Sequence, residues 1–244
     1  MSTQFNFKRE EKKYFLTPMQ YEILRNAVQP YMQADEHEKY TICNLYYDTD
    51  DWQLIRTSIE KPIYKEKLRV RSYGVPTDGD SVFIELKKKY KGTVYKRRIT
   101  QPAEYSGLVL ERPKLLPNTQ IAREIAWFQQ QYHTRPKVFI AYDRTALAGI
   151  EEPELRMTFD TNLRWRQTDL DLRLGDYGAP ILPDSDAILM ELKLPGHCPL
   201  WLGHLLSELR IFPVSFSKYG SWYQSIIANQ NHITNLSKEA LYSA

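Results

Sequence analysis

Charged and apolar residues alternate at a spacing of two in five separate stretches of this chain: Leu68–Arg71, Phe83–Lys89, Lys96–Arg98, Arg156–Arg166 and Leu189–Lys193. In an extended strand, residues two apart share a face, so each stretch would place its charges on one side and its apolar residues on the other. Lys and Arg dominate the charged positions, with a few carboxylates among them. The pattern predicts antiparallel strands that give most of the sheet one charged face.

An ordinary solvated sheet surface would also show polar residues on one face, and a single strand on its own favours that interpretation. The recurrence of basic residues on strands spread along the chain favours a site instead. Many like charges on one curved sheet repel each other unless an anion lies between them. We therefore expect this face to bind a polyanion.

The overall charge is nearly balanced, with 33 Lys and Arg against 30 Asp and Glu. A net charge of +3 does not suit a general nucleic-acid-binding arm, so the basic residues must be concentrated rather than abundant. The charged strands also lack interleaved aromatic residues and an RNP-type motif, which argues against an RNA-binding module. We predict no nucleic-acid partner.

The sequence contains no run of 18 apolar residues, and its N-terminus is charged where a signal peptide needs an apolar core. We therefore expect a cytoplasmic protein without a transmembrane segment of its own. Peripheral attachment at the inner face of the membrane, through a separate membrane-protein partner, stays open. Cys43 and Cys198 lie far apart and outside any CxxC spacing, which favours free thiols over a disulfide or a zinc site.

No linker or repeat divides the sequence, so we expect one domain over residues 1–244, with a core from about 5 to 230 and a tail over 231–244. Thr17, Pro18 and Gln20 form a capping box that starts a core helix. Asn118 is expected to cap a later helix. Strands are predicted over 4–16, 40–47, 63–73, 81–90, 94–100, 136–148, 155–167 and 187–194. Helical patterns are predicted near 17–30, between 102 and 132, and near 202–209 and 217–229, the last two outside the sheet.

Several phosphate-handling and catalytic motifs are missing from the sequence, including GxxxxGK[ST], GxGxxG and HExxH. Any bound phosphate must therefore be held by side chains. The acidic residues Asp48, Asp50 and Asp51 lack the spacing of a calcium loop, and a helix cap suits them better. No Ser-His-Asp or Cys-His arrangement is evident, which gives covalent catalysis little support.

Eight ordered motifs run from about Phe7 to Tyr223: Arg9–Tyr14, Asn44–Asp48, Lys67–Tyr73, Phe83–Lys87, Lys96–Arg98, Tyr142–Arg144, Met190–Lys193 and Ser215–Tyr219. Together they resemble the polyphosphate polymerase domain of the vacuolar transporter chaperone (VTC) family, within the CYTH-like triphosphate tunnel metalloenzyme superfamily. The chain resembles a stand-alone, bacterial-type member of that family.

The resemblance implies an α+β fold in which a closed, antiparallel, eight-stranded β-barrel forms a triphosphate tunnel, with helices packed outside. It also implies an enzyme that transfers the γ-phosphate of ATP to a growing polyphosphate chain, with Mn²⁺ or Mg²⁺ as cofactor and with ATP and polyphosphate or pyrophosphate as ligands. Carried over by motif, the catalytic residues are Lys13, Arg69, Arg71, Lys87, Arg144 and Lys218, the substrate-binding residues are Arg9, Lys96, Arg98, Tyr142 and Ser217, and the metal-holding residue is Glu191.

Two alternatives stay open: an inorganic or nucleoside triphosphatase of the same superfamily, and a non-catalytic polyphosphate-binding subunit. The hydrolytic branches carry ExExK on the first strand, whereas this chain has Arg9, Glu11 and Lys13 there, which favours the polymerase branch. Taken singly, each basic residue also suits a solvated surface, and Glu191 also suits an ion pair with Lys193. A terminal phosphate is already ionised at neutral pH, so transfer needs no general base, and we expect the product to leave by the far mouth of the tunnel.

Overall fold

One antiparallel sheet of ten strands forms the centre of the computed structural model, which describes residues 10–182 and 186–227. The strands lie in the order β10-β1-β9-β7-β6-β2-β3-β4-β5, and β8 pairs with β7. Their bounds are β1 (Glu10–Leu16), β2 (Met32–Asp48), β3 (Tyr64–Tyr73), β4 (Ser81–Tyr90), β5 (Thr93–Pro102), β6 (Arg135–Gly149), β7 (Arg156–Arg166), β8 (Ala179–Pro180), β9 (Ile188–Leu194) and β10 (Pro213–Val214).

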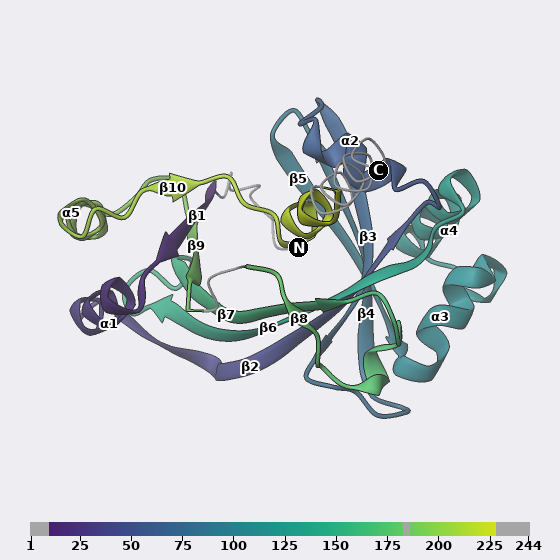
Figure 1. Ribbon diagram of the computed structural model, residues 1–244, viewed down its shortest axis with the longest axis horizontal. Coiled ribbons are helices and arrows are strands. Elements are labelled where there is room, and N and C mark those ends of the chain that lie inside the picture. Colours follow the sequence, from purple (N-terminus) through teal and green to yellow (C-terminus); the bar gives the residue numbers. More distant parts are fainter. Residues whose placement is uncertain (1–9, 183–185, 228–244) are drawn as a thin grey trace, which may run out of the picture.

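Two groups of helices cover the outer face of this sheet (Figure 1). One apolar core joins α1 and α5 to β1, β7 and β9, and a second joins α3 and α4 to β2, β3 and β4. The helices are α1 (Pro18–Ala27), α2 (Gln53–Ile59), α3 (Ala103–Glu111), η1 (Pro113–Leu115), α4 (Gln120–Tyr132), η2 (Leu172–Leu174) and α5 (Leu200–Glu208), and residues 218–227 form a further helix, here named the C-terminal helix. Within the described ranges, no helix has the length and apolar character needed to cross a lipid bilayer.

The beginnings of two helices follow from local sequence signals. The Thr17 hydroxyl accepts a hydrogen bond from the Gln20 N–H at 3.2 Å, and the Gln20 side chain accepts the Thr17 N–H at 3.0 Å, which confirms the predicted capping box. For α4, Thr119 rather than Asn118 is the cap, because the Thr119 hydroxyl accepts the N–H of Ala122. The prediction for α4 was therefore wrong by one residue.

Asp48 accepts hydrogen bonds from the first turn of α2 and contacts the C-terminal helix. Its carboxylate accepts the N–H groups of Leu54 and Ile55 at 2.9 and 3.0 Å, as the helix-cap interpretation of the acidic cluster predicts. The hydroxyl of Tyr219 donates to the same buried carboxylate at 2.7 Å. One acidic side chain thus connects two helices that are far apart in the sequence.

Strand β2 begins at Met32, eight residues before the predicted start at Tyr40. Acidic residues are frequent in the added segment, and they are poor strand formers, so the sequence pattern gives no strand signal there. Pairing with β6 overrides this weak propensity, with a register shift between Ala34 and Lys39. Tertiary pairing, rather than local preference, decides where β2 starts.

The sheet is strongly curved. In the strand order, β1 and β3 are five spacings apart, or about 24 Å in a flat sheet. Yet Lys13 of β1 donates to the Phe216 carbonyl at 3.0 Å, and Lys67 of β3 donates to the Ser217 hydroxyl at 3.2 Å. Two consecutive residues can contact both strands only if the sheet bends around them. The face that carries Lys13 and Lys67 is therefore concave, and the C-terminal helix lies between the two arms of the sheet (Figure 1).

The prediction of a closed, eight-stranded barrel is wrong in two respects. Ten strands take part, eight of them seven residues or longer, and in the described part of the chain no pairing joins β5 to β1 or β10. Alternation of residue types predicts strands and their faces, but it does not determine which two edges of a sheet meet. The antiparallel sheet with helices on its outer face is as expected.

The C-terminal helix was predicted to pack outside the sheet, and this is also wrong. Tyr219 and Trp222 belong to an apolar cluster with Tyr46, Ile140 and other residues of the concave face. The rings of Tyr46 and Tyr219 stack with centroids 4.5 Å apart. These aromatic residues cover the apolar part of the concave face, because the open sheet does not bury that part by closing on itself.

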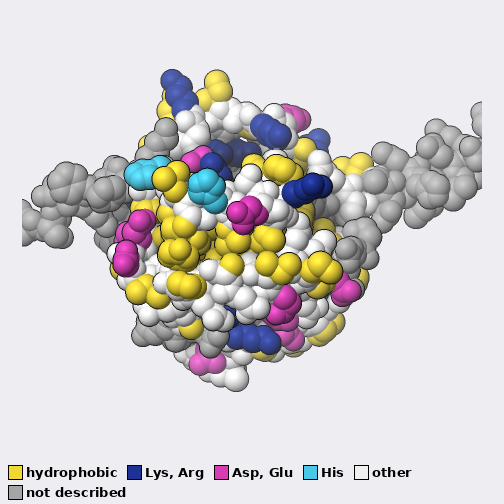
Figure 2. All heavy atoms as spheres, turned by 90° about the vertical axis from the view of Figure 1, so that its left-hand side faces the viewer, with side chains coloured by type: hydrophobic (Ala, Val, Ile, Leu, Met, Phe, Trp, Pro, Cys, Tyr) yellow, Lys and Arg dark blue, Asp and Glu magenta, His cyan; other side chains and the backbone are white. Residues whose placement is uncertain are grey.

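Exposed apolar side chains gather on the surface around α1, α5 and β10, which faces the viewer in Figure 2. Met19 of α1 is 73% exposed, and Leu200 of α5 is 82% exposed. Tyr31 and Trp201 stack with centroids 4.1 Å apart and attach α5 to the segment before β2. Because α1 and α5 cover the outer side of the sheet, the sheet separates them from the charged concave face.

Candidate anion-binding site

Three neighbouring strands present charged residues to the concave face in cross-strand rows. Alternation places every second residue of β3, β4 and β5 on this face, and antiparallel pairing brings these residues side by side. The lysine row consists of Lys67, Lys87 and Lys96, and the next row consists of Arg69, Glu85 and Arg98. Cations from three strands therefore share one face, as the sequence pattern predicts.

Glu85 is the buried carboxylate at the centre of this arm of the sheet, with 1% of its surface exposed. Arg69 Nε donates to it at 2.9 Å, the Lys96 ammonium lies 2.5 Å away, and Arg71 lies 3.9 Å away. Burial opposes ionisation of Glu85, but the charges of Arg69, Arg71 and Lys96 outweigh burial and lower its pKa to about 2. In this Glu85 cluster, three cations surround one ionised carboxylate, so positive charge is left in excess.

Lys67 belongs to the lysine row, although the motif comparison did not single it out as a site residue. Its ammonium donates to Ser217 and lies 5.8 Å from the ring centroid of Tyr219. Burial, reinforced by the like charges of neighbouring lysines, lowers the pKa of Lys67 to about 8. Its position two residues before Arg69 is the sequence signal that could have identified it.

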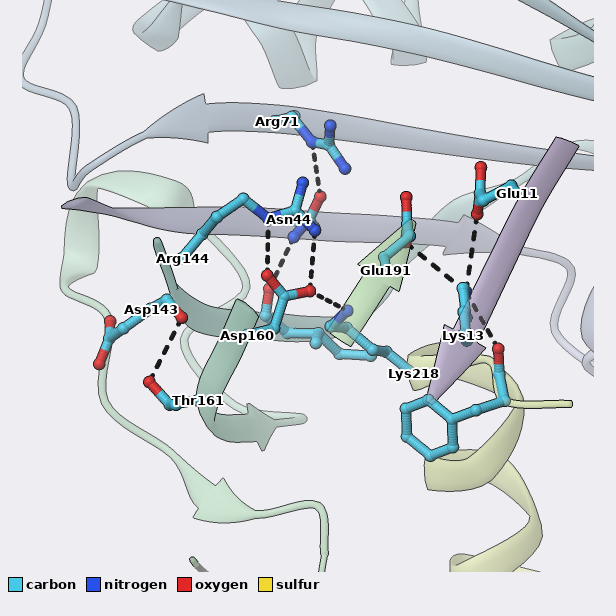
Figure 3. A network of polar contacts seen from close by, with 12 residues as sticks. Glu11, Lys13, Asn44, Arg71, Asp143, Arg144, Asp160, Thr161, Glu191 and Lys218 are labelled. Carbon is cyan, nitrogen blue, oxygen red and sulfur yellow. Dashed lines mark hydrogen bonds and ion pairs between the residues drawn. The ribbon is translucent and has the colours of Figure 1, made fainter. Parts of the chain in front are cut away.

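A second buried carboxylate, Asp160 of β7, organises the other arm (Figure 3). Arg144 donates to both of its oxygens, from Nε at 2.6 Å and from a terminal nitrogen at 2.8 Å, and Lys218 donates at 2.6 Å. Burial opposes ionisation of Asp160, but Lys218 and Arg144 outweigh it and lower the pKa to about 2. The ring of Tyr142 lies against both cations of this Asp160 cluster, with its centroid 5.3 Å from Arg144 and 4.2 Å from Lys218.

Glu191 of β9 pairs in register with Lys13 of β1 (Figure 3). Its oxygens lie 4.0 Å from the Lys13 ammonium and 3.8 Å from that of Lys193, too far for hydrogen bonds. The ion pair with Lys193 that the sequence left open is therefore present, but loose. Burial opposes ionisation, yet the charges of Lys13 and Arg144, among others, hold the pKa of Glu191 below its usual value. Glu191 is thus an ionised carboxylate with weakly held oxygens.

Glu191 suits one way of holding a divalent cation. Among the described residues, no three His, Cys, Asp or Glu side chains form a ready-made metal cage. Mg²⁺, however, is often bound by one or two carboxylates and completes its coordination with water and phosphate oxygens. A second carboxylate, that of Glu11, lies 3.9 Å from the Lys13 ammonium. The donor set therefore fits an ion that arrives with a phosphate ligand.

The predicted site residues of the strands lie on the concave face. Ser217 and Lys218, at the start of the C-terminal helix, contact this face, and Arg9 lies outside the described ranges. Arg71 donates to Asn44 at 2.9 Å, and Asn44 in turn donates to a β6 carbonyl. Burial lowers the pKa of Lys87, although its side chain is reachable by solvent.

Ser217 accepts the N–H of Gly220 at 3.2 Å, so it caps the C-terminal helix in addition to contacting Lys67. Asn44, Lys67, Glu85 and Asp160 complete the site and were not predicted as members.

The second half of β7 departs from the predicted alternation. Asn162 has a φ of 50°, and the pairing with β6 shifts register between Ala141 and Asp143. This bulge turns the following residues over, so that Leu163 joins the apolar cluster of the concave face. The prediction that all charged residues from Arg156 to Arg166 share one face is therefore wrong beyond Asp160.

Arg164 and Arg166, the two arginines after the bulge, contact other parts of the fold rather than the site. Arg164 forms ion pairs with Asp143 at 3.2 Å and with Asp176 at 2.6 Å. Arg166 lies between two aromatic rings, and its three nitrogens donate to the backbone carbonyls of residues 169, 171 and 177. Their guanidinium groups thus stabilise the loop after β7 rather than the site.

Comparison with known proteins identifies relatives in sequence and in fold. The family model of the VTC domain matches residues 8–227. Vacuolar transporter chaperone complex subunit 4 of Schizosaccharomyces pombe is 24% identical over 271 residues, which cover 89% of this chain and 37% of that protein. The chain therefore spans little more than a third of the length of this relative.

Two solved structures share the fold at low sequence identity. A proposed adenylate cyclase from Bacillus halodurans is 15% identical, with a TM-score of 0.53 and coverage of 86% of this chain and 95% of its own. A proposed adenylyl cyclase from Hippeastrum, described as having a dominant triphosphatase activity, is 14% identical, with a TM-score of 0.52 and coverage of 88% and 95%. The fold is thus similar to that of these two proteins. By its sequence, the chain belongs to the VTC domain family.

Proposed function

We propose that this protein is a polyphosphate polymerase, an ATP:polyphosphate phosphotransferase that extends a phosphate chain on its concave face. The observation that supports this most is the convergence of the Glu85 cluster, the Asp160 cluster and the loosely held Glu191 on one face. Membership of the VTC domain family, with subunit 4 of the S. pombe complex as a relative, supports the same activity.

In the proposed reaction, an ionised oxygen of the terminal phosphate of the acceptor forms a bond to the γ-phosphorus of ATP. The bond from that phosphorus to the β–γ bridging oxygen breaks, and ADP leaves with the electron pair. The transition state is loose and carries its charge on phosphate oxygens, so alignment and positive charge provide most of the catalysis. Because the acceptor oxygen is already ionised, the reaction needs no proton acceptor.

The cations that would bind the phosphates are held in place before any ligand arrives. Glu85 fixes Arg69 and Lys96, and Asp160 fixes Arg144 and Lys218, each through contacts of 2.5 to 2.9 Å. Charged donors that are already oriented lose little conformational freedom when phosphate oxygens bind. The two clusters would align donor and acceptor phosphates from two sides.

We also propose Mn²⁺ or Mg²⁺ as cofactor, held by Glu191 together with phosphate oxygens. When bound, the ion would reduce the repulsion between donor and acceptor phosphates. Lys13, 4.0 Å from Glu191, would bind phosphate oxygens beside it. Because the named relative is a subunit of a complex, we further propose that this chain has a separate partner protein. We also propose that it uses ATP from the cytoplasm.

A turnover experiment tests the proposed function. Purified protein is incubated with ATP, a short polyphosphate primer and either Mn²⁺ or Mg²⁺, while chain length is resolved on a gel and ADP and free phosphate are measured. We expect chain growth with one ADP per added phosphate. Arg69→Ala and Glu191→Ala should each lower the rate by about 100-fold, the usual order for loss of one charge-stabilising contact.

Arg123→Ala serves as the matched control, because Arg123 is an exposed arginine on α4 whose side chain donates to Asn118. Its rate should equal that of the unaltered protein. Release of free phosphate without chain growth would identify a triphosphatase instead. Tight triphosphate binding without turnover would identify a polyphosphate-binding subunit.

A further inference from the structure

An aromatic row crosses the concave face beside the arginines of the site. It consists of Tyr40 on β2, Tyr73 on β3 and Phe83 on β4, which are neighbouring strands. The ring centroids of Tyr40 and Tyr73 are 5.6 Å apart, and those of Tyr73 and Phe83 are 5.8 Å apart. On β5, the guanidinium of Arg98 lies 4.4 Å from the Phe83 centroid and extends the row by one strand.

The aromatic row is continuous with both arms of the anion-binding site. Tyr73 follows Arg71 by two residues, so it lies on the same face about 7 Å further along the strand. Phe83 precedes Glu85 by two residues on β4, so these two side chains also share a face. Tyr40 of β2 pairs in register with Arg144 of β6. A ligand whose phosphates bind the cations can therefore place its remaining part on these rings.

Tyr73 is held in one orientation while much of its surface stays open. Its two aromatic neighbours meet it at 64° and 74°, which are edge-to-face arrangements that stabilise aromatic pairs. Nevertheless, 52% of the residue surface is exposed. A single exposed aromatic residue is ordinary, but a fixed and open ring beside a cationic site is suited to stacking on a flat ligand.

We propose that the aromatic row, together with Arg98, is the subsite for the nucleobase of the nucleoside triphosphate donor. This proposal rests on the proposed function and adds the orientation of the donor. The base would stack on Tyr73 and on the guanidinium plane of Arg98, and the phosphates would run from Arg71 towards the lysine row. Stacking reads the flat face that all bases share, so the subsite would tolerate different bases.

One base with several phosphates fits this face better than an RNA strand does. Among the described residues, the concave face continues from the aromatic row into Arg71, Arg69 and then Lys67, without a second exposed aromatic platform on β3. A single-stranded nucleic acid would need successive platforms for successive bases. The face instead offers one stacking position followed by cations.

Isothermal titration of ATP and of inorganic tripolyphosphate, at one ionic strength, separates the base from the phosphates. We expect Tyr73→Leu to weaken ATP binding about tenfold, within the range for loss of one stacked base. Tripolyphosphate affinity should change less than twofold, and Tyr73→Phe should keep ATP affinity because it keeps the ring. The matched control is Tyr90→Leu on β4, which removes a 47% exposed tyrosine from the outer face of the sheet.

The proposal is overturned if Tyr73→Leu weakens ATP and tripolyphosphate by the same factor, or weakens neither. In those cases the phosphate site stands and the base subsite does not. If the unaltered protein binds neither ligand, the proposed function itself fails, and the base subsite fails with it. Thermal unfolding of each variant, expected within a few degrees of the unaltered protein, shows that the comparison is made on folded protein.

Discussion

Two arginines with opposite surroundings lie on different strands of this sheet, Arg166 on β7 and Arg71 on β3. Arg166, after the bulge in β7, lies between the rings of Phe139 and Tyr177, at 3.6 and 4.5 Å from their centroids, and donates to three backbone carbonyls. Arg71, on the concave face, makes one hydrogen bond to Asn44 and lies 3.9 Å from Glu85. Both are mostly buried, and both come from strands with alternating charges.

The kind of partner separates these two regions. Backbone carbonyls are part of the fold, so Arg166 cannot turn towards a ligand without leaving buried acceptors unpaired. The Arg71 guanidinium, held by one side-chain hydrogen bond beside a buried carboxylate, is oriented, yet it keeps further N–H donors for phosphate oxygens. The type of partner therefore distinguishes a structural arginine from a ligand-binding arginine here, whereas residue type and strand position do not.

The largest expected effect is the loss of activity in the Arg71→Ala variant. We expect the kcat/KM for ATP-dependent chain growth to fall by about 100- to 1000-fold, or roughly 3 to 4 kcal/mol of transition-state stabilisation. Unfolding in urea should show a loss of only about 1 kcal/mol, since one hydrogen bond is removed. A stability loss as large as that of an Arg166 variant, with activity retained, would break the distinction between the two regions.

The second largest expected effect is the loss of stability in the Arg166→Met variant. Methionine keeps the contacts with Phe139 and Tyr177 but leaves three backbone carbonyls without their donor. We expect the free energy of unfolding to fall by about 3 kcal/mol, as measured by urea unfolding. Activity per folded molecule should stay within about twofold of the unaltered protein, as expected away from the reacting atoms. A 100-fold loss of activity in a fully folded variant would place Arg166 in the site after all.

Acid should lower the stability of the protein by protonating the buried carboxylates of Glu85 and Asp160. Glu85 and Asp160 have pKa values of about 2 in the folded protein, below their ordinary values of 4.5 and 3.8. Their contribution is therefore complete above about pH 4.5 and is lost as the pH falls towards 2, at about 3.5 kcal/mol for Glu85 and about 2.5 kcal/mol for Asp160. Urea unfolding between pH 7 and pH 3 measures this loss. Asp160→Asn should show a shallower decline, and an unchanged slope would exclude Asp160 as a contributor.

The smallest effect concerns the pH dependence of binding. Lys67 is charged below its pKa of about 8 and neutral above it, so ATP affinity should fall about fivefold, or roughly 1 kcal/mol, between pH 7 and pH 9.5. Burial opposes ionisation of Tyr46, but Arg69 outweighs it and lowers the pKa of Tyr46 to about 8, so its ionisation acts in the same direction.

Two variants separate these contributions in the same titration. Lys67→Arg keeps its charge throughout and should flatten the profile in part, and Tyr46→Phe should remove the other part. The pH dependence of ATP affinity is measured calorimetrically for all three proteins. A flat profile for the unaltered protein would show that neither group faces the bound phosphates.

The sequence predicts the strands and the cation positions well because both depend on local spacing. Alternation placed Arg69 and Arg71 on one face, and the reciprocal side chains of Thr17 and Gln20 located a helix start. The bulge at Asn162 was not predicted, because one residue at positive φ reverses the faces of everything after it. Asparagine tolerates this conformation better than most residues, and that is the available signal.

The buried carboxylates and the open sheet depend on contacts between distant parts of the chain. Glu85 and Asp160 lie in the charged strands, but a motif comparison that looks for phosphate binders selects the cations beside them. A general rule that buried cations need buried counter-charges would have pointed to both. Which edges of the sheet meet, and on which face the C-terminal helix lies, follow from long-range packing that local patterns do not encode.

The site includes residues that are far apart in the sequence, because Lys218 contacts Asp160 and Ser217 contacts Lys67. This separation determines when the site can form during synthesis. A ribosome makes the cations on the strands before it makes Ser217 and Lys218. Until the C-terminal helix emerges and docks, Asp160 lacks one of its two cations, and Lys67 lacks the hydroxyl that it contacts. A nascent chain that does not yet include this helix therefore carries an incomplete site, and the phosphate-binding surface becomes whole only after the helix has docked.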